Sequence, residues 1–78
     1  MENARSFLTR ATGQTVVITL KDDRRIKGKL DGFDEFINLS LEDAEEETPA
    51  RTRKIGKVVV RGSQVIGVHA MKLSPSAP

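Results

Sequence analysis

Apolar and polar residues alternate along much of the chain after residue 13, which is the period of a half-buried β-strand. Five segments show this alternation or a strand-like composition, and they are residues 14–20, 25–33, 37–44, 53–61 and 65–70. The first of them is rich in β-branched residues, which favour strands. The pattern therefore predicts five consecutive strands joined by short connections.

A short amphipathic helix is expected before these strands. Its apolar residues recur at the helical spacing i, i+3, i+4 and i+7, and they are Ala4, Phe7, Leu8 and Ala11. Asn3 is a suitable N-cap, and Gly13 is a typical helix stop. We expect the apolar face of this helix to cover the open end of a sheet.

Two glycines in the second predicted strand bear on the shape of that sheet. Gly28 and Gly32 fall on the same row as Ile26 and Leu30. Glycines weaken a flat strand, but they permit the strong bend that a small barrel needs to close on itself. The chain is therefore predicted to be mostly β, with a short N-terminal α-helix followed by a five-stranded, strongly bent antiparallel small barrel. A two-residue connection, Gly62-Ser63, is expected between the last two strands.

Size and composition favour self-association. A chain of 78 residues is one small domain, which buries only roughly 60% of the surface that its unfolded form exposes. Such domains are usually supplemented by disulfides, a metal or oligomerisation, and this sequence has no cysteine and a single histidine, His69. We expect one domain over residues 1–73, a disordered tail over residues 74–78, no cofactor and no metal site.

Charge is distributed unevenly along the chain. Residues 1–50 hold all eleven acids and seven Lys or Arg, a net charge of −4, whereas residues 51–78 hold six Lys or Arg and no acid, a net charge of +6. A basic segment favours a polyanionic partner, and a folded surface that mixes both signs of charge is the alternative. The five acids among residues 42–47 lack the ligand spacing of known cation-binding loops, so we expect them to form a solvated strand end and loop.

The apolar runs are short and cysteine is absent. No run approaches the roughly 20 residues that a membrane span needs, and a lack of cysteine fits a reducing compartment. We therefore expect a cytoplasmic protein with no membrane contact.

The stretch over residues 32–41 carries the candidate chemistry. Phe36 is out of phase with the apolar row of the third predicted strand, and it shares a face with Asn38 if strand geometry extends back to it. An aromatic ring and an amide that stand together away from the core can stack on a flat ligand and read its edge. Phe36 as a core residue and Asn38 as a turn-stabilising amide are the structural alternatives.

Two spaced motifs resemble those of the Sm and Sm-like (LSm) RNA-binding proteins, in their archaeal type. The first motif spans residues 13–17, 27–30, 32–39 and 41–46, with the run Gly32-Phe33-Asp34-Glu35-Phe36-Ile37-Asn38-Leu39, and the second spans residues 55–62 and 65–68, with Arg61-Gly62. The resemblance covers nearly all of residues 4–71. It implies the Sm fold and a ring in which the fourth strand of one subunit pairs with the fifth strand of the next.

The resemblance also implies a function and a site. The family rings bind uridine-rich single-stranded RNA at the central pore, and we expect a homomeric ring, a heptamer rather than a hexamer, that acts as an RNA scaffold or chaperone. Carried over residue by residue, Phe36 stacks on a base and Asn38 hydrogen-bonds its edge. Arg61 closes the other side of the pocket, for which a surface ion pair is the alternative. Asp34 orients Asn38 or Arg61, although an Asx turn alone would explain it, and Gly62 gives the turn its backbone freedom.

Two departures from the family pattern qualify this assignment. Phe36 stands where other members often have histidine or tyrosine, so stacking is retained and a polar contact from the ring is lost. The run Val68-His69-Ala70 is similar to the lysine-histidine-alanine run of bacterial hexameric relatives, but the lysine is missing. We interpret His69 as structural or interfacial.

The expected function has three alternatives. One is a subunit of a mixed, eukaryotic-type ring in RNA processing. Another is a small barrel that binds protein, such as a reader of methylated side chains, but three Phe with no Trp or Tyr do not readily build an aromatic cage. An enzyme is not expected, because no cysteine and one histidine leave no plausible pairing of base and nucleophile.

Overall fold

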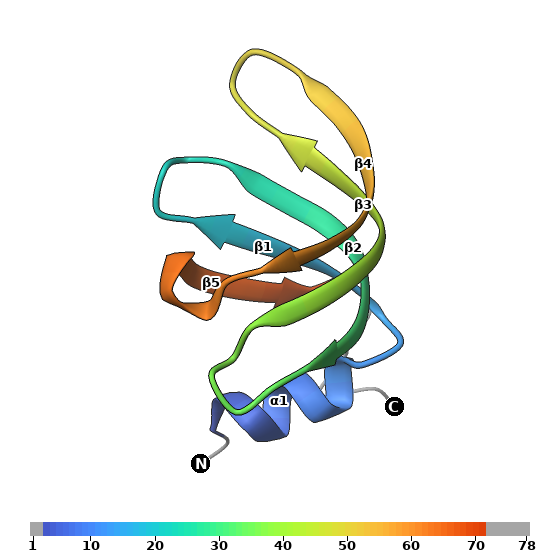
Figure 1. Cartoon of the computed structure of the whole chain (residues 1–78), viewed down its shortest axis with the longest axis vertical. Helices are drawn as coiled ribbons and strands as arrows, with labels where there is room; N and C mark the ends of the chain where they lie inside the picture. The colour runs from blue at the N-terminus through green and yellow to red at the C-terminus, as the bar shows by residue number, and fades with distance from the viewer. Residues whose placement is uncertain (1–2, 72–78) are drawn as a thin grey trace.

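A computed structural model describes residues 3–71 and contains one helix followed by five strands (Figure 1). The elements are α1 (Ala4–Ala11), β1 (Thr15–Leu20), β2 (Arg25–Phe33), β3 (Leu39–Glu47), β4 (Thr52–Val60) and β5 (Val65–Ala70), with a short 3₁₀ helix, η1 (Gly62–Gln64), before β5. The strands form one antiparallel sheet in the order β4-β3-β2-β1-β5. The predicted fold class is confirmed. The tail expected over residues 74–78 lies outside the described residues.

The helix has the predicted N-cap and covers one end of the bent sheet (Figure 1). Asn3 Oδ1 accepts a hydrogen bond from the backbone N–H of Ser6 at 2.9 Å. Gly13 follows the helix with a φ of +88°, a conformation that favours glycine, and its N–H donates to the carbonyl of Leu30. Leu8 and Ala11 are buried, so the apolar face of α1 packs on the sheet as expected.

The core consists of the inward rows of the strands together with the helix. Its buried apolar residues are Leu8, Ala11, Val16, Ile18, Leu20, Ile26, Leu30, Leu39, Leu41, Ala44, Val60 and Ala70. Burial alternates strictly along β1 and along the first six residues of β2, which is the period that the sequence predicts. No helix within residues 3–71 is long and apolar enough to cross a membrane.

Gly28 lies where β2 and β3 approach closely. A Cβ atom at Gly28 would lie 3.0 Å from the Cα of Ala44 and 3.0 Å from the carbonyl oxygen of Glu42, closer than side chains normally approach. The pairing of β2 with β3 is irregular on either side of Lys29, and Asp43, beside this contact, has a φ of 51°. Gly32 has open space at its Cβ position, so of the two glycines in β2 only Gly28 is closely packed.

The third strand differs from the prediction at both ends. It begins at Leu39 rather than at residue 37, because Ile37 has a φ of 61° and residues 34–38 form a turn. It continues through Glu47, so the loop expected in the acidic segment is wrong, although Asp43 and Glu47 are exposed as expected of a solvated strand end. Glu46 is only 9% exposed and accepts hydrogen bonds from Arg24 at 2.8 Å and from Arg53 at 3.1 Å. Arg24, just before β2, and Arg53 of β4 therefore stabilise an acid that has no evident partner in the sequence.

The last connection also differs from the prediction. Strand β4 ends at Val60, and residues 62–64 form the 3₁₀ helix η1 in place of a two-residue hairpin turn. The N–H of Gln64 donates to the carbonyl of Arg61 at 2.9 Å. The N–H of Gly62 instead donates to a side chain of another loop, Asn38. The conformation of this connection is thus tied to a distant residue.

Strands β4 and β5 are the two edges of the sheet. Among residues 3–71, β4 pairs only with β3, and β5 pairs only with β1. Each edge strand exposes a large aliphatic side chain, with Val59 64% exposed on β4 and Ile66 63% exposed on β5. The described part of the chain therefore leaves two strand edges, each with an exposed aliphatic side chain, without backbone partners.

Candidate nucleic-acid interface

Asp34 organises the loop between β2 and β3. Its Oδ1 atom accepts hydrogen bonds from the backbone N–H groups of Phe36 at 2.9 Å and Asn38 at 3.0 Å. Its Oδ2 atom accepts from Nδ2 of Asn38 at 2.9 Å. The hydrogen bond from the Asn38 side chain, followed by the backbone N–H donors, lowers the pKa of Asp34 below its ordinary value. Asp34 thus forms an Asx turn and also orients Asn38, rather than Arg61.

Asn38 joins this loop to the loop between β4 and β5. Its Oδ1 atom accepts a hydrogen bond from the backbone N–H of Gly62 at 2.8 Å, while its Nδ2 atom donates to Asp34. The amide therefore fixes the relative position of two loops that lie far apart in the sequence. Asn38 therefore has the turn-stabilising role given above as its structural alternative. One of its two Nδ2 hydrogens is left to donate to another acceptor.

Gly62 is required by the close approach of these two loops. A Cβ atom at this position would lie 2.7 Å from the carbonyl oxygen of Ile37 and closer still to that of Phe36. Any other residue would push the loops apart. The sequence predicted a need for glycine here on grounds of backbone freedom, but no positive φ is found at Gly62, and the requirement is steric.

The two loops line a common hollow on the surface. Its lining residues are Phe36, Ile37, Asn38, Arg61, Gly62, Ser63 and Val65. The Phe36 side chain is 72% exposed, so it is not a core residue. Arg61 is exposed, and its guanidinium has no ion-pair or hydrogen-bond partner within residues 3–71. The four predicted residues Phe36, Asn38, Arg61 and Gly62 thus meet at one site, with Asp34 hydrogen-bonded to Asn38.

Phe36 and Asn38 would share one face if strand geometry extended back to Phe36, but β3 begins at Leu39 and both residues lie in a turn. Ile37, with its φ of 61°, reverses the local direction of the chain between them, and the hydrogen bonds to Asp34 hold that reversal. The turn, rather than strand alternation, brings the ring and the amide to one hollow.

Sequence reasoning missed three residues that line the hollow. Ile37 and Val65 supply apolar walls, and Ser63 supplies a hydroxyl group that can donate or accept a hydrogen bond. The only sequence signal for Ser63 was its position next to Arg61-Gly62.

Among residues 3–71, no group of three or more His, Asp or Glu side chains is placed to hold a metal ion. The hollow therefore offers an aromatic face, a guanidinium plane and hydrogen-bond donors, which suit a nucleotide base.

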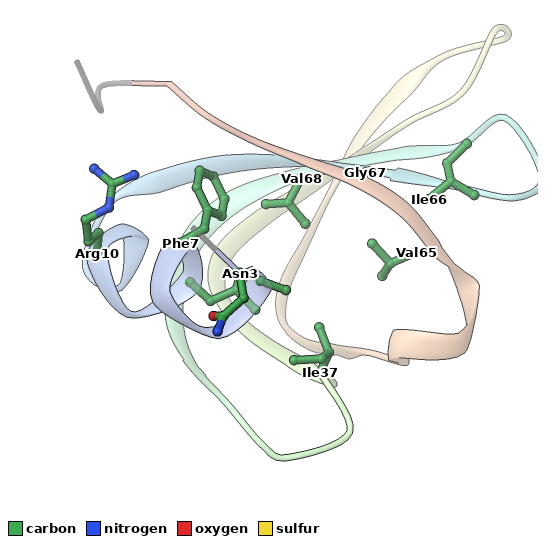
Figure 2. A pocket seen from close by; sticks show the side chains of 10 residues that line it. Asn3, Phe7, Arg10, Ile37, Val65, Ile66, Gly67 and Val68 are labelled. Atoms are coloured by element: carbon green, nitrogen blue, oxygen red, sulfur yellow. The ribbon is translucent and has the colours of Figure 1, made fainter. Parts of the chain in front are cut away.

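A second hollow lies between α1 and β5 (Figure 2). Its walls are mainly apolar and include Phe7 of α1, Ile37, and Val65 and Val68 of β5. Ile37 and Val65 line both hollows, so the two adjoin. This groove runs beside the unpaired edge of the sheet at β5.

Comparison with known proteins identifies the family. The model of the LSM domain matches residues 6–70. The chain belongs to the Sm-like family. Over 62 residues this Sm-like protein is 44% identical to a relative from Archaeoglobus fulgidus that carries an snRNP Sm-like description, covering 78% of this chain and 80% of the relative. The resemblance noted in the sequence is confirmed.

Solved structures agree with this assignment. The Sm-like protein superposes on the P. aerophilum SmAP1 heptamer subunit with a TM-score of 0.84 and 34% identity, covering 94% of this chain and 99% of the other. It matches the Pyrococcus abyssii Sm protein, solved in complex with a uridine heptamer, with a TM-score of 0.84 and 28% identity. That match covers 90% of this chain and 100% of the other. The bent barrel with an N-terminal helix is the Sm fold.

Proposed function

We propose that this Sm-like RNA-binding protein forms a homomeric heptameric ring that binds uridine-rich single-stranded RNA and acts as an RNA scaffold or chaperone. The observation that carries the proposal is the hollow in which Phe36, Asn38 and Arg61 meet. Solved relatives support it, since one is a heptamer and another binds a uridine heptamer.

The hollow has the chemistry for one base per subunit. Phe36 exposes most of its ring and Arg61 has a guanidinium without a partner among residues 3–71, so both planes are available for stacking. Stacking of a base on such a plane contributes roughly 1–3 kcal/mol. The remaining Nδ2 hydrogen of Asn38 donates to a base carbonyl, which uracil presents on its edge.

Ring formation follows from the edges of the sheet. Pairing β4 of one subunit with β5 of the next satisfies both rows of free backbone groups and covers Val59 and Ile66. The apolar groove between α1 and β5 adds surface to the same contact. A ring repeats the hollow around a continuous strand, so avidity raises the affinity above that of one weak site.

Native mass spectrometry with and without oligouridine tests the assembly. We expect one discrete homo-oligomer that gains the mass of the RNA. A monomer or dimer that assembles only with other chains would indicate a mixed, eukaryotic-type ring. A homo-oligomer that binds a peptide and no single-stranded RNA would indicate a protein-binding barrel.

Substitutions in the hollow test the site. Phe36→Ala and Arg61→Ala should each weaken oligouridine binding at least about fivefold, the equivalent of one lost stacking contact, with the ring intact. Fluorescence anisotropy at fixed salt measures the affinity. Glu35→Gln is the matched control, because Glu35 is exposed in the same loop and does not line the hollow. Undiminished binding in either hollow variant would remove that residue from the site.

A further inference from the structure

The solvent-facing side of the sheet carries two rows of opposite charge. Exposed cations of β2 alternate with its buried residues, and this cationic row is Arg25, Lys27 and Lys29. Strand pairing places an acid of β3 opposite each cation, and this acidic row is Glu47, Glu45 and Glu42 in the same order. The Nε atom of Arg25 lies 3.2 Å from Oε1 of Glu47. Every member of the cationic row therefore has a carboxylate residue as its cross-strand neighbour.

Glu45 has cationic residues on both sides. It pairs with Lys27 on β2 and with Lys54 on β4. Directly opposite residues of antiparallel strands have Cβ atoms about 4.5–5.5 Å apart. That separation is shorter than the Debye length of about 8 Å at physiological salt. The carboxylate of Glu45 therefore reduces the positive potential that Lys27 and Lys54 present to a polyanion.

Arg61 has a different electrostatic setting. Its guanidinium has no ion-pair or hydrogen-bond partner in the described part of the chain, and no acid lines its hollow. A protein cation gains affinity for RNA by displacing counterions from the phosphates, and a cation that already faces a carboxylate contributes less. A contact with an RNA phosphate therefore adds more binding affinity at Arg61 than at the cationic row.

We propose that the acidic row of β3 is a specificity determinant: it neutralises the cationic row of β2, so that the open face of the sheet does not hold the RNA backbone and RNA is confined to the hollow at Arg61. The inference rests on the proposed RNA-binding function. It assigns a role to the acidic segment, whose part in the protein the sequence left unexplained.

The test uses a full-length chain that carries Phe36→Ala and Arg61→Ala, so that binding in the hollow is disabled. Two isosteric variants are then compared in that background. Glu45→Gln removes an acid that faces two lysines. Asp43→Asn removes the same charge from the same strand, but Asp43 is an exposed residue with no register partner on β2 or β4. Its φ of 51° is one that asparagine tolerates. Anisotropy with labelled oligoadenylate at about 50 mM and about 200 mM salt reports binding to the backbone.

Glu45→Gln should tighten oligoadenylate binding roughly threefold or more at the lower salt, with the gain lost at the higher salt, and Asp43→Asn should give a clearly smaller gain. No gain with Glu45→Gln, or equal gains in both variants, would overturn the proposal. In a chain with an intact hollow, Lys27→Gln should leave oligouridine affinity unchanged, and a marked loss there would also overturn it. A separate comparison tests the proposed function itself. Equal oligouridine affinity of the wild type and of the chain with Phe36→Ala and Arg61→Ala would contradict that function.

Discussion

Oδ1 of Asn38 accepts a hydrogen bond from the backbone N–H of Gly62 at 2.8 Å, across 24 residues of sequence. The same amide donates to Asp34 at 2.9 Å. One side chain therefore holds the loop between β2 and β3 against the loop between β4 and β5. The hollow that Phe36 and Arg61 flank depends on that connection.

Replacement of Asn38 should destabilise the protein as well as impair binding. Asn38→Ala leaves the N–H of Gly62 without its partner, and we expect the free energy of unfolding to fall by roughly 1–3 kcal/mol. Urea denaturation at a fixed protein concentration measures it. Phe36→Ala is the control, because its exposed ring contributes little to folding. Equal stability of the two variants would show that the hydrogen bond to Gly62 does not hold the loops.

Gly62→Ala should separate the two loops. The added methyl group meets the backbone carbonyls of Phe36 and Ile37, and overpacking of this kind costs about 1–3 kcal/mol. We expect lower stability together with weaker oligouridine binding, measured by denaturation and anisotropy. Gly32→Ala is the matched control, since a methyl group there meets open space. A Gly62→Ala protein as stable as the control would contradict the steric requirement.

Stability should fall in acid through Glu46. Hydrogen bonds from Arg24 first, and then from Arg53, lower the pKa of Glu46 from its ordinary value of 4.5. Its stabilisation is therefore complete above pH 4.5 and is lost as the pH falls through the lowered pKa of the folded state. The lowered pKa of Asp34 acts in the same direction from its ordinary value of 3.8.

We expect the Tm of the wild type to be constant near neutral pH and to drop below pH 4.5. Glu46→Gln should have a Tm lower by a few degrees at pH 7 and a shallower decline in acid. Thermal unfolding followed by circular dichroism between pH 7 and pH 3 compares the two proteins. An acid decline of the same steepness in both would exclude Glu46 as a source of the pH dependence.

An acidic side chain at the β5 edge should disrupt the ring. Ile66→Glu places a charge where the neighbouring subunit is expected to pack, so we expect smaller species in native mass spectra with the fold retained by circular dichroism. Phe36→Glu is the control, because it replaces another exposed apolar residue outside both edge strands. An intact ring in the Ile66→Glu protein would exclude the β5 edge as the interface.

Much of the fold can be predicted from the sequence because it depends on the local periodicity of apolar residues. Asn3 and Gly13 mark the ends of the helix, and the apolar rows of β1 and β2 predict which residues are buried. The structure brings Phe36, Asn38, Arg61 and Gly62 to one hollow. The family resemblance supplied Arg61 and Gly62, since no local pattern links them to Phe36. Their role in RNA binding stays a prediction.

The order of the elements, the helix cap and the alternating core can be predicted from the sequence, because they depend on apolar spacing and a capping residue within a few positions. Only the folded sheet brings Glu46 between two arginines and Asn38 to the N–H of Gly62. Each of these depends on strand register between distant segments. Register is set by the packing of the whole sheet, so no short stretch of sequence specifies it.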